Sequence, residues 1–288
     1  MDLPFFLIQL LNSVQYGLLL FLIASGLTLT LGIMGIINVA HGSFYMIGAY
    51  LAYSLSSLTD NLLFSIAIGV PLTVVLGIVL EWLLLSRLYR REHLQQLLVT
   101  YGLILVFEEL RSIAVGDDVH GVAVPEVLGA SIPLTENLSY PVYRLVMSGV
   151  CLLLAGGLYV LIHRTRVGMM IRACNSNREM AQTLGVNTKL VYRLVFGLGV
   201  GLAAFAGMLA APVSSVFPGM GNQVLILCFV VVILGGIGSV WGALGAALAI
   251  GFADTFGKVL FPDYAGFALY LPMGAIILWR PEGLSGRT

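Results

Sequence analysis

Two long uncharged stretches dominate the pattern of apolar and polar positions along the chain. They cover residues 3–59 and 194–253, so 57 and 60 consecutive residues lack Asp, Glu, Lys and Arg. At about 1.5 Å per residue, either stretch as one helix would exceed about 80 Å, whereas a bilayer core is about 30 Å thick. Each stretch must therefore turn back at least once.

Four shorter uncharged runs each have room for one further membrane crossing. They cover residues 61–80, 94–107, 145–162 and 264–279. The pattern predicts an all-α polytopic membrane protein, a bundle of about eight transmembrane helices, or nine, with glycine-rich breaks. It forms a single transmembrane domain over residues 1–288. Four of its spans are expected at roughly 62–86, 94–115, 141–163 and 190–212.

Composition and charge narrow the class of protein. Hydrophobic residues make up 59% of the chain and charged residues 10%, which excludes a soluble globular protein. The 14 basic and 14 acidic residues leave no net charge, so no nucleic-acid partner is expected. The three cysteines, Cys151, Cys174 and Cys228, show no CxxC pattern, and neither a metal nor another cofactor is expected. The start lacks the positive flank of a cleaved signal peptide, so the first apolar run is expected to remain as a span.

Charges are distributed unevenly between the loops. Basic residues gather at 87–91, 164–193 and 280–287, whereas the loop at 116–140 carries four acidic residues and no Lys or Arg. Short loops rich in Lys and Arg stay in the cytoplasm. The loop at 164–189 is therefore expected to be cytoplasmic and the loop at 116–140 external. The same alternation places the C-terminus in the cytoplasm.

Glycine-rich stretches interrupt both long runs, at residues 32–42 and 234–245. Interrupted spans in corresponding parts of a chain are typical of a transporter's substrate pathway. The candidate pathway residues are Asn38, His41, Gly42, Gly235, Gly236 and Gly238. For Asn38 and His41 a structural role is the first interpretation, because their side chains can satisfy backbone groups freed by the break. A functional role for the intramembrane histidine is the alternative.

Small residues recur at intervals of four on two predicted helices. One row is Gly199, Ala203, Gly207 and Ala211, and the other is Gly245, Ala249, Ala253 and Gly257, beside Gly238, Gly242 and Ala246. Such rows let helices approach closely in lipid. Both rows are therefore expected to pack within a compact bundle.

The few charged residues near the spans are interpreted as local pairs. Asp254 and Lys258, four residues apart, are expected to form an ion pair, with an ion relay as the alternative. Glu108 and Arg111 are interpreted in the same way, and Glu81 is expected to reach the cytoplasmic surface. Because the chain has no phosphate-binding loop, zinc-protease motif or nucleophile with a base, it is not expected to be an enzyme or to hydrolyse ATP itself.

The basic loop contains the most informative local pattern. Ser176 followed by Glu179 has the spacing of a capping box, and Gly185 is suited to end a helix in the left-handed conformation. A helix of about eight residues is expected between them. Its apolar face would carry Met180, Ala181 and Leu184. Asn187 is expected to cap the next span. A helix lying on the membrane surface is the alternative interpretation.

The same loop carries a family resemblance. The order of Glu179, Met180 and Ala181, with Gly185 six residues after the glutamate, is similar to the EAA-xxx-G loop of ATP-binding-cassette (ABC) importer permeases. Over nearly the whole chain, the sequence resembles the LivH-type permease of branched-chain amino acid importers. The segments that carry this resemblance are 26–50, 100–110, 229–251 and 270–286. Two features depart from the general motif: Met180 replaces its first alanine, and no I-x-L-P sequence follows Gly185.

The resemblance implies a coupling role for the loop at about 164–189, whose short helix would dock in a cleft of an ATPase. The implied coupling residues are Ser176, Glu179, Met180, Ala181, Leu184 and Gly185. The implied partners are two cytoplasmic ABC ATPases, a second related permease in a heterodimer, and a periplasmic or lipid-anchored substrate-binding protein. Together with membrane lipid, these partners would place the chain in a bacterial or archaeal cytoplasmic (inner) membrane.

The resemblance also implies the substrate class. It indicates leucine, isoleucine or valine, with urea and short amides as the alternative within the family. Outside the family, the alternative is an ion-coupled secondary transporter or a channel, which would need a titratable group facing a cavity inside the membrane. The two uncharged stretches argue against that alternative.

Overall fold

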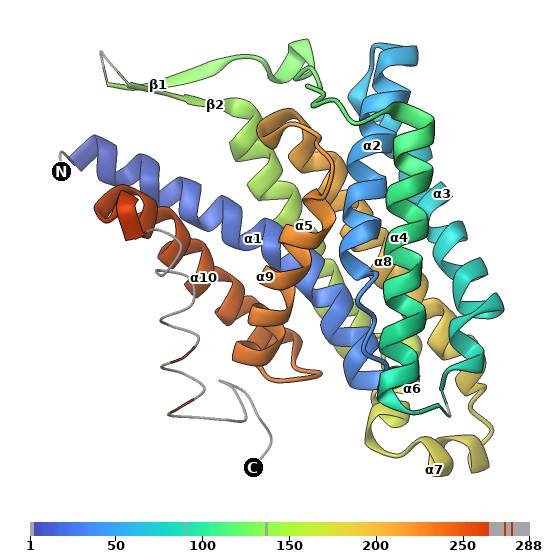
Figure 1. Ribbon diagram of the computed structural model, residues 1–288. Helices are drawn as coiled ribbons and strands as arrows, with labels where there is room; N and C mark the ends of the chain where they lie inside the picture. Colours follow the sequence, from blue (N-terminus) through green and yellow to red (C-terminus); the bar gives the residue numbers. More distant parts are fainter. Residues whose placement is uncertain (1–2, 90, 136–137, 265–273, 275–277, 279–288) are drawn as a thin grey trace.

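The computed structural model is a helical bundle with one small hairpin of strands (Figure 1). It describes residues 3–89, 91–135 and 138–264, together with residues 274 and 278. The α-helices of this part of the chain are α1 (Leu3–Met34), α2 (His41–Thr59), α3 (Leu62–Leu83), α4 (His93–Val115), α5 (Val142–Arg164), α6 (Arg166–Ser176), α7 (Arg178–Thr183), α8 (Thr188–Ser214), α9 (Met220–Gly235) and α10 (Val240–Leu260). Strands β1 (Ser131–Thr135) and β2 (Leu138–Pro141) pair in antiparallel fashion, and the short 3₁₀ helices are η1 (Leu85–Arg87), η2 (Glu126–Leu128) and η3 (Pro262–Tyr264).

Both long uncharged stretches turn back, as the sequence predicts. The first forms α1 and α2, joined at Gly35, whose φ of 66° lets the chain reverse. The second turns back twice, because glycines with positive φ stand between α8 and α9 and between α9 and α10. These are Gly219, Gly236 and Gly238, with φ values of 79°, 89° and 80°. The stretch therefore contains three helices.

The long helices agree with the predicted multi-pass membrane architecture. The four predicted spans at 62–86, 94–115, 141–163 and 190–212 correspond to α3, α4, α5 and α8. Within the described residues, five segments are long and apolar enough to cross a membrane. They are Leu3–Met34, Leu62–Arg87, Val142–Arg164, Thr188–Ser214 and Val240–Leu260. Helix α9 is apolar but shorter, with 16 residues. The crossing predicted at 264–279 lies almost entirely outside the described residues.

Helices α1 and α8 form the centre of the bundle and cross in close contact. A Cβ atom added at Gly26 of α1 would lie 2.6 Å from the carbonyl oxygen of Gly199 in α8. Farther along α8, a Cβ at Gly207 would lie 2.1 Å from the carbonyl oxygen of Tyr45 in α2. The prediction that the small residues of α8 pack inside the bundle is confirmed.

The prediction for the small residues of α10 is wrong in part. Gly245 and Ala249 are exposed, and an added Cβ at Gly245 would meet no described atom within 4 Å. A different face of α10 packs against α1. This face carries Gly251, which lies against the backbone of α1. A Cβ there would be 2.5 Å from the carbonyl oxygen of Ser13. Several faces of α10 carry small residues, so spacing alone cannot choose the buried one.

The charged loops lie at opposite ends of the bundle (Figure 1). The acidic loop at 116–140, including the β-hairpin, lies at the end where α2 meets α3. The basic loop containing α6 and α7 lies at the other end. This separation is what the asymmetry of basic and acidic residues predicts for a polytopic protein.

Candidate functional site

Helices α6 and α7 build the basic loop, and their caps differ from the predicted ones. Thr165 caps the start of α6, and its Oγ1 accepts a hydrogen bond from the Gly168 amide at 3.1 Å. Ser176 is the last residue of α6 and does not cap α7, so the predicted capping box is wrong. The cap is Asn177, which has an extended backbone and whose Oδ1 accepts from the Met180 amide at 2.9 Å. Helix α7 therefore has six residues.

The end of α7 and the start of α8 follow the sequence prediction. Gly185 has a φ of 86°, in the left-handed region that a glycine adopts without strain. The amide of the next residue, Val186, donates to the carbonyl of Ala181 at 3.0 Å and closes the helix end. Asn187 then caps α8, accepting a hydrogen bond from the Leu190 amide at 3.2 Å. The link between α7 and α8 is thus fixed at both ends, by the closed C-terminus of α7 and by the Asn187 cap of α8.

Helix α7 and its C-cap residue present two large apolar side chains to solvent. Met180 is 58% exposed and Leu184 is 76% exposed, and they lie four residues apart. Ala181 is buried at 2%, so it does not share their face as the sequence analysis expected. Glu179 is exposed as well. One side of α7 packs on the bundle through Ala181, and the other offers an apolar surface.

An aromatic cluster anchors α7 to the bundle. The guanidinium carbon of Arg178 lies 5.0 Å from the centre of the Tyr192 ring and 5.8 Å from that of the Tyr89 ring. The two rings meet edge to face at 5.1 Å. Cation–π contacts of this kind contribute about 0.5–2 kcal/mol each. A second link joins Gln182 Nε2 of α7 to Thr188 Oγ1 of α8 at 2.8 Å.

The same cluster continues to a buried glutamate, and we call Glu81, Tyr89, Arg178, Tyr192 and Arg193 the anchoring cluster. Glu81 is 1% exposed, which corrects the expectation that it reaches the surface. Its carboxylate accepts hydrogen bonds from the Tyr89 hydroxyl and, at 3.1 Å, from Arg193 Nε. Burial and the bond to Glu81 raise the pKa of Tyr89, so its phenol stays protonated and donates. The cluster ties α7 to the ends of α3 and α8.

The sequence alone does not predict the anchoring cluster. A useful signal was present, because Glu81 stands in the last turn of an apolar span, where a carboxylate needs either water or partners. The partners, however, are Tyr89 and Arg193, which are 8 and 112 residues away in the sequence. A single sequence does not reveal contacts of that range.

At the first glycine-rich break, polar side chains satisfy nearby backbone groups. Asn38 is 2% exposed, and its Oδ1 accepts from the Ala40 amide at 3.1 Å. His41 is fully buried, and its Nε2 donates to the carbonyl oxygen of Ile23 at 2.9 Å. Gly42 packs on α9, since a Cβ there would lie 2.1 Å from the Gly221 carbonyl oxygen. These contacts fit the structural interpretation, and a pathway role for the three residues stays a hypothesis.

The second break packs against the first. A Cβ at Gly32 would lie 2.5 Å from the Cα of Gly238, so the end of α1 touches the turn between α9 and α10. Gly235 packs on the start of α10, where a Cβ would lie 2.5 Å from the Ala243 amide nitrogen. Asn175, near the end of α6, lies beside Gly238. The structure thus brings both breaks and the basic loop together at one end.

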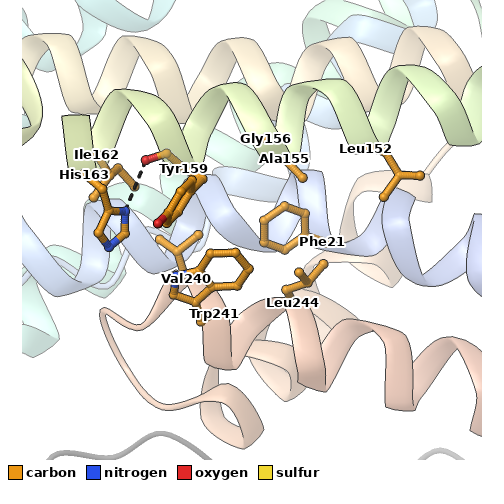
Figure 2. Close-up of a pocket in the computed structure, with 10 residues that line it drawn as sticks. All are labelled: Phe21, Leu152, Ala155, Gly156, Tyr159, Ile162, His163, Val240, Trp241 and Leu244. Carbon is orange, nitrogen blue, oxygen red and sulfur yellow. Dashed lines mark hydrogen bonds between the residues drawn. The ribbon is translucent and has the colours of Figure 1, made fainter. Parts of the chain in front are cut away.

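An apolar cavity of about 210 Å³ opens beside the second break, between α1, α5 and α10 (Figure 2). Val240 and Trp241, which begin α10, form one wall, and Tyr159 of α5 faces Trp241 with ring centres 5.1 Å apart. His163 closes one end, with Nδ1 3.1 Å from the Tyr159 carbonyl oxygen. None of the predicted pathway residues lines this cavity. Among the described residues, no group of three or more His, Cys, Asp or Glu side chains could hold a metal ion.

Comparison with known proteins identifies one family. The family described as "Branched-chain amino acid transport system / permease component" matches residues 9–277. BraD of Pseudomonas aeruginosa, a high-affinity branched-chain amino acid transport system permease protein, is 31% identical over 98% of this chain and 96% of its own length. LivH of Escherichia coli K12, described in the same words, is 30% identical with the same coverage.

More distant similarities extend the comparison. A probable branched-chain amino acid transport permease protein LivH of Methanocaldococcus jannaschii is 27% identical over 96% of this chain and 91% of its own length. Among solved structures, PsaBC from Streptococcus pneumoniae in complex with Fab covers 93% of this chain and 88% of that chain, with a TM-score of 0.51. Its sequence identity is 11%, so this likeness shows the fold alone.

Proposed function

Because the chain belongs to the family of permease components of branched-chain amino acid transport systems, we propose that its basic loop receives the motion of partner ATPases in an ABC importer. The chain then forms part of the transmembrane pathway, and hydrolysis takes place in other subunits. Helices α6 and α7, within the loop at about 164–189, are the coupling element of a single permease domain that spans the chain. The loop faces the cytoplasm, and the C-terminus lies on the same side.

The observation that carries this proposal is the difference between the two sides of α7, one buried against the bundle and the other apolar and exposed. Its inner side is fixed, through buried Ala181 and the cation–π contacts of Arg178. Its outer side exposes Met180 and Leu184 to water. Covering these two side chains with a partner protein would be favourable, because it would remove apolar surface from water. A helix attached firmly on one side and apolar on the other is suited to transmit force from a docked protein. The left-handed Gly185, which ends α7, sets the direction in which the chain leaves the helix.

The connections of the loop reach the elements that would have to move. Through the anchoring cluster, α7 is joined to the ends of α3 and α8. Through Asn175, α6 borders the turn at Gly238, which touches Gly32 at the end of α1. Displacement of the loop would therefore act on both glycine-rich breaks. This arrangement supports a role for Gly235, Gly236 and Gly238 as flexible points of the pathway.

The proposed assembly contains two cytoplasmic ABC ATPases, a second related permease and a periplasmic or lipid-anchored substrate-binding protein. Family membership supports this composition, and so do the exposed small residues Gly245 and Ala249 of α10, which leave room for close approach of another helix in the membrane. The pair of permeases is proposed to be a heterodimer surrounded by lipid of the cytoplasmic membrane.

The proposed substrates are leucine, isoleucine and valine. The relatives BraD and LivH are named for branched-chain amino acid transport, and they match this chain over almost its full length. In the assembled importer, unlabelled isoleucine and valine should compete with labelled leucine for uptake, whereas urea and acetamide should not. Competition by urea or acetamide alone would favour the short-amide alternative.

Docking of α7 is tested by cross-linking. Single cysteines at Met180 and Leu184, in a chain without its three native cysteines, should form cross-links to an ATPase subunit with a short bifunctional thiol reagent. Lys189→Cys is the matched control, because Lys189 is exposed near by but belongs to the first turn of α8. Equal cross-linking from Lys189 and from both α7 positions, or none from α7, would contradict the docking site.

A further inference from the structure

A polar cleft lies between the N-terminal part of α1 and the C-terminal part of α10, close to the β-hairpin, whose Tyr140 donates to Asn12 in the cleft. Its volume is about 400 Å³, and α5 and α8 complete its walls. The lining residues that matter here are Asn12, Gln15, Arg144, Val213, Asp254 and Lys258. Polar side chains gathered within apolar helices are costly against lipid, so such a cleft faces water or another protein.

The cleft contains a carboxylate that is almost completely withdrawn from solvent. The side chain of Asp254 is 7% exposed, and its Oδ2 accepts from Lys258 Nζ at 2.6 Å. Lys258 is 61% exposed, so the cation of this pair is in contact with solvent while the anion faces inward. Among the described residues, Asp254 Oδ1 receives no hydrogen bond. One carboxylate oxygen is therefore available to a further cationic donor.

A cation with no acidic partner among the described residues stands on another wall of the same cleft. Arg144 Nη1 donates to Asn12 Oδ1 at 2.8 Å, and Tyr140 donates to the same oxygen at 3.2 Å. Both contacts are to a neutral side chain, which holds the guanidinium in position. Within the described part of the chain, Arg144 forms no ion pair, in contrast to Arg111, Arg193 and Lys258. Its remaining N–H groups match the geometry of a carboxylate.

We propose that this cleft binds the zwitterionic group of an α-amino acid at the outer side of the permease. Arg144 receives the carboxylate and Asp254 the ammonium group, while Val213 offers an apolar contact to the side chain. The inference rests on the proposed function, because it takes the transported amino acid as the ligand and names where it first meets this chain. A purely structural Asp254–Lys258 pair is the competing explanation.

Substrate protection tests the cleft directly. Thr255, which lines it, is replaced by Cys in a chain whose native cysteines are Ala, and the assembled importer is treated with a maleimide. We expect leucine to slow labelling severalfold. At the same concentration, 3-methylbutylamine, which lacks the carboxylate, and 4-methylpentanoate, which lacks the ammonium group, should leave the rate unchanged. Equal protection by either analogue, or none by leucine, would overturn the proposal.

Substitutions then separate binding from folding. Asp254→Asn and Arg144→Gln should each raise the leucine concentration for half-protection about tenfold or more, as expected for losing a charge-assisted hydrogen bond. Glu108→Gln, which removes the acid of an ion pair on α4, should leave it unchanged. The double variant Asp254→Lys with Lys258→Asp keeps a pair at the same positions but should not restore protection. Restored protection would show that the pair is structural and overturn the proposal.

The same preparation distinguishes the two proposals. ATP-driven leucine uptake is measured in parallel with the unmodified importer. Uptake without protection of Thr255→Cys would overturn the cleft and leave the proposed function intact, whereas absence of ATP-driven uptake would overturn the proposed function itself.

Discussion

At the residue scale, Gly185 sets the direction of α7 through a backbone conformation that few residues tolerate. Its φ of 86° is strained for any side chain and most of all for a β-branched one. Gly185→Val should cost about 1–2 kcal/mol at this position and misalign the helix end. We expect an assembled importer whose substrate-stimulated ATP hydrolysis and uptake both fall severalfold.

The control for this variant is Gly102→Val in α4. Gly102 has an ordinary helical backbone, and an added Cβ would meet no described atom within 4 Å. Its stimulated hydrolysis should match that of the unmodified importer. Wild-type coupling by an assembled Gly185→Val importer would show that the conformation of this residue does not matter to transport.

Single residues also show how far local sequence signals reach. The left-handed Gly185 and the Asn187 cap follow from propensities that act within one turn of helix, and both were predicted. The predicted cap of α7, Ser176, is wrong, and the neighbouring Asn177 caps the helix instead. Both residue types are good caps, so the choice depends on where α6 ends. Partners of Glu81 come from distant segments, so its burial could not be foreseen.

At the element scale, α7 depends on Arg178 for its attachment to α8 and to the segment after η1. The guanidinium contacts both tyrosine rings of the anchoring cluster, and partial burial strengthens such contacts. Arg178→Ala should loosen α7 while leaving Met180 and Leu184 able to dock. We expect basal ATP hydrolysis to persist while the number of substrate molecules moved per ATP falls, with partial recovery in Arg178→Lys.

Lys189→Ala provides the comparison, because Lys189 is an exposed basic residue of the same loop. This substitution also removes one positive charge but leaves the anchoring cluster intact. The number of substrate molecules moved per ATP should therefore equal that of the unmodified importer. If Arg178→Ala and Lys189→Ala behave alike, the effect arises from loop charge, and the anchoring cluster plays no part in coupling.

The elements themselves were largely predictable. Helices stand within a few residues of the four predicted spans because apolar runs are bounded by charges, and the break at Gly35 is visible as a glycine-rich interruption. The second long stretch forms three helices where two were the minimum, because the turn at Gly219 contains no charge to mark it. The buried face of α10 was also beyond reach, since Gly245 and Gly251 are equally small and only packing distinguishes them.

At the scale of the whole molecule, we expect the separation of charges between the two ends to set the orientation in the membrane. Asn177 in the basic loop is exposed, and Val127 in the acidic loop is 89% exposed. Single cysteines at these positions should react with an impermeant thiol reagent from opposite sides of the membrane. In intact cells, only Val127→Cys should be labelled.

A chain that keeps Cys174 as its single cysteine provides a separate check on this measurement. Cys174 is buried at the same end as Asn177, and burial raises the pKa of its thiol, so it should react slowly even in opened membranes. Labelling of Asn177→Cys from outside intact cells would reverse the orientation and remove the coupling role proposed for α7.

The central claim is that this chain moves substrate only when partner subunits hydrolyse ATP. The test is reconstitution of the purified protein in liposomes with labelled leucine, first alone under an imposed proton or sodium gradient. The complete set of ATPases, second permease and binding protein is then added with ATP on the ATPase side. We predict no concentrative uptake in the first case and uptake in the second, abolished by a non-hydrolysable ATP analogue. Concentrative uptake by the chain alone, driven by an ion gradient, would contradict the account.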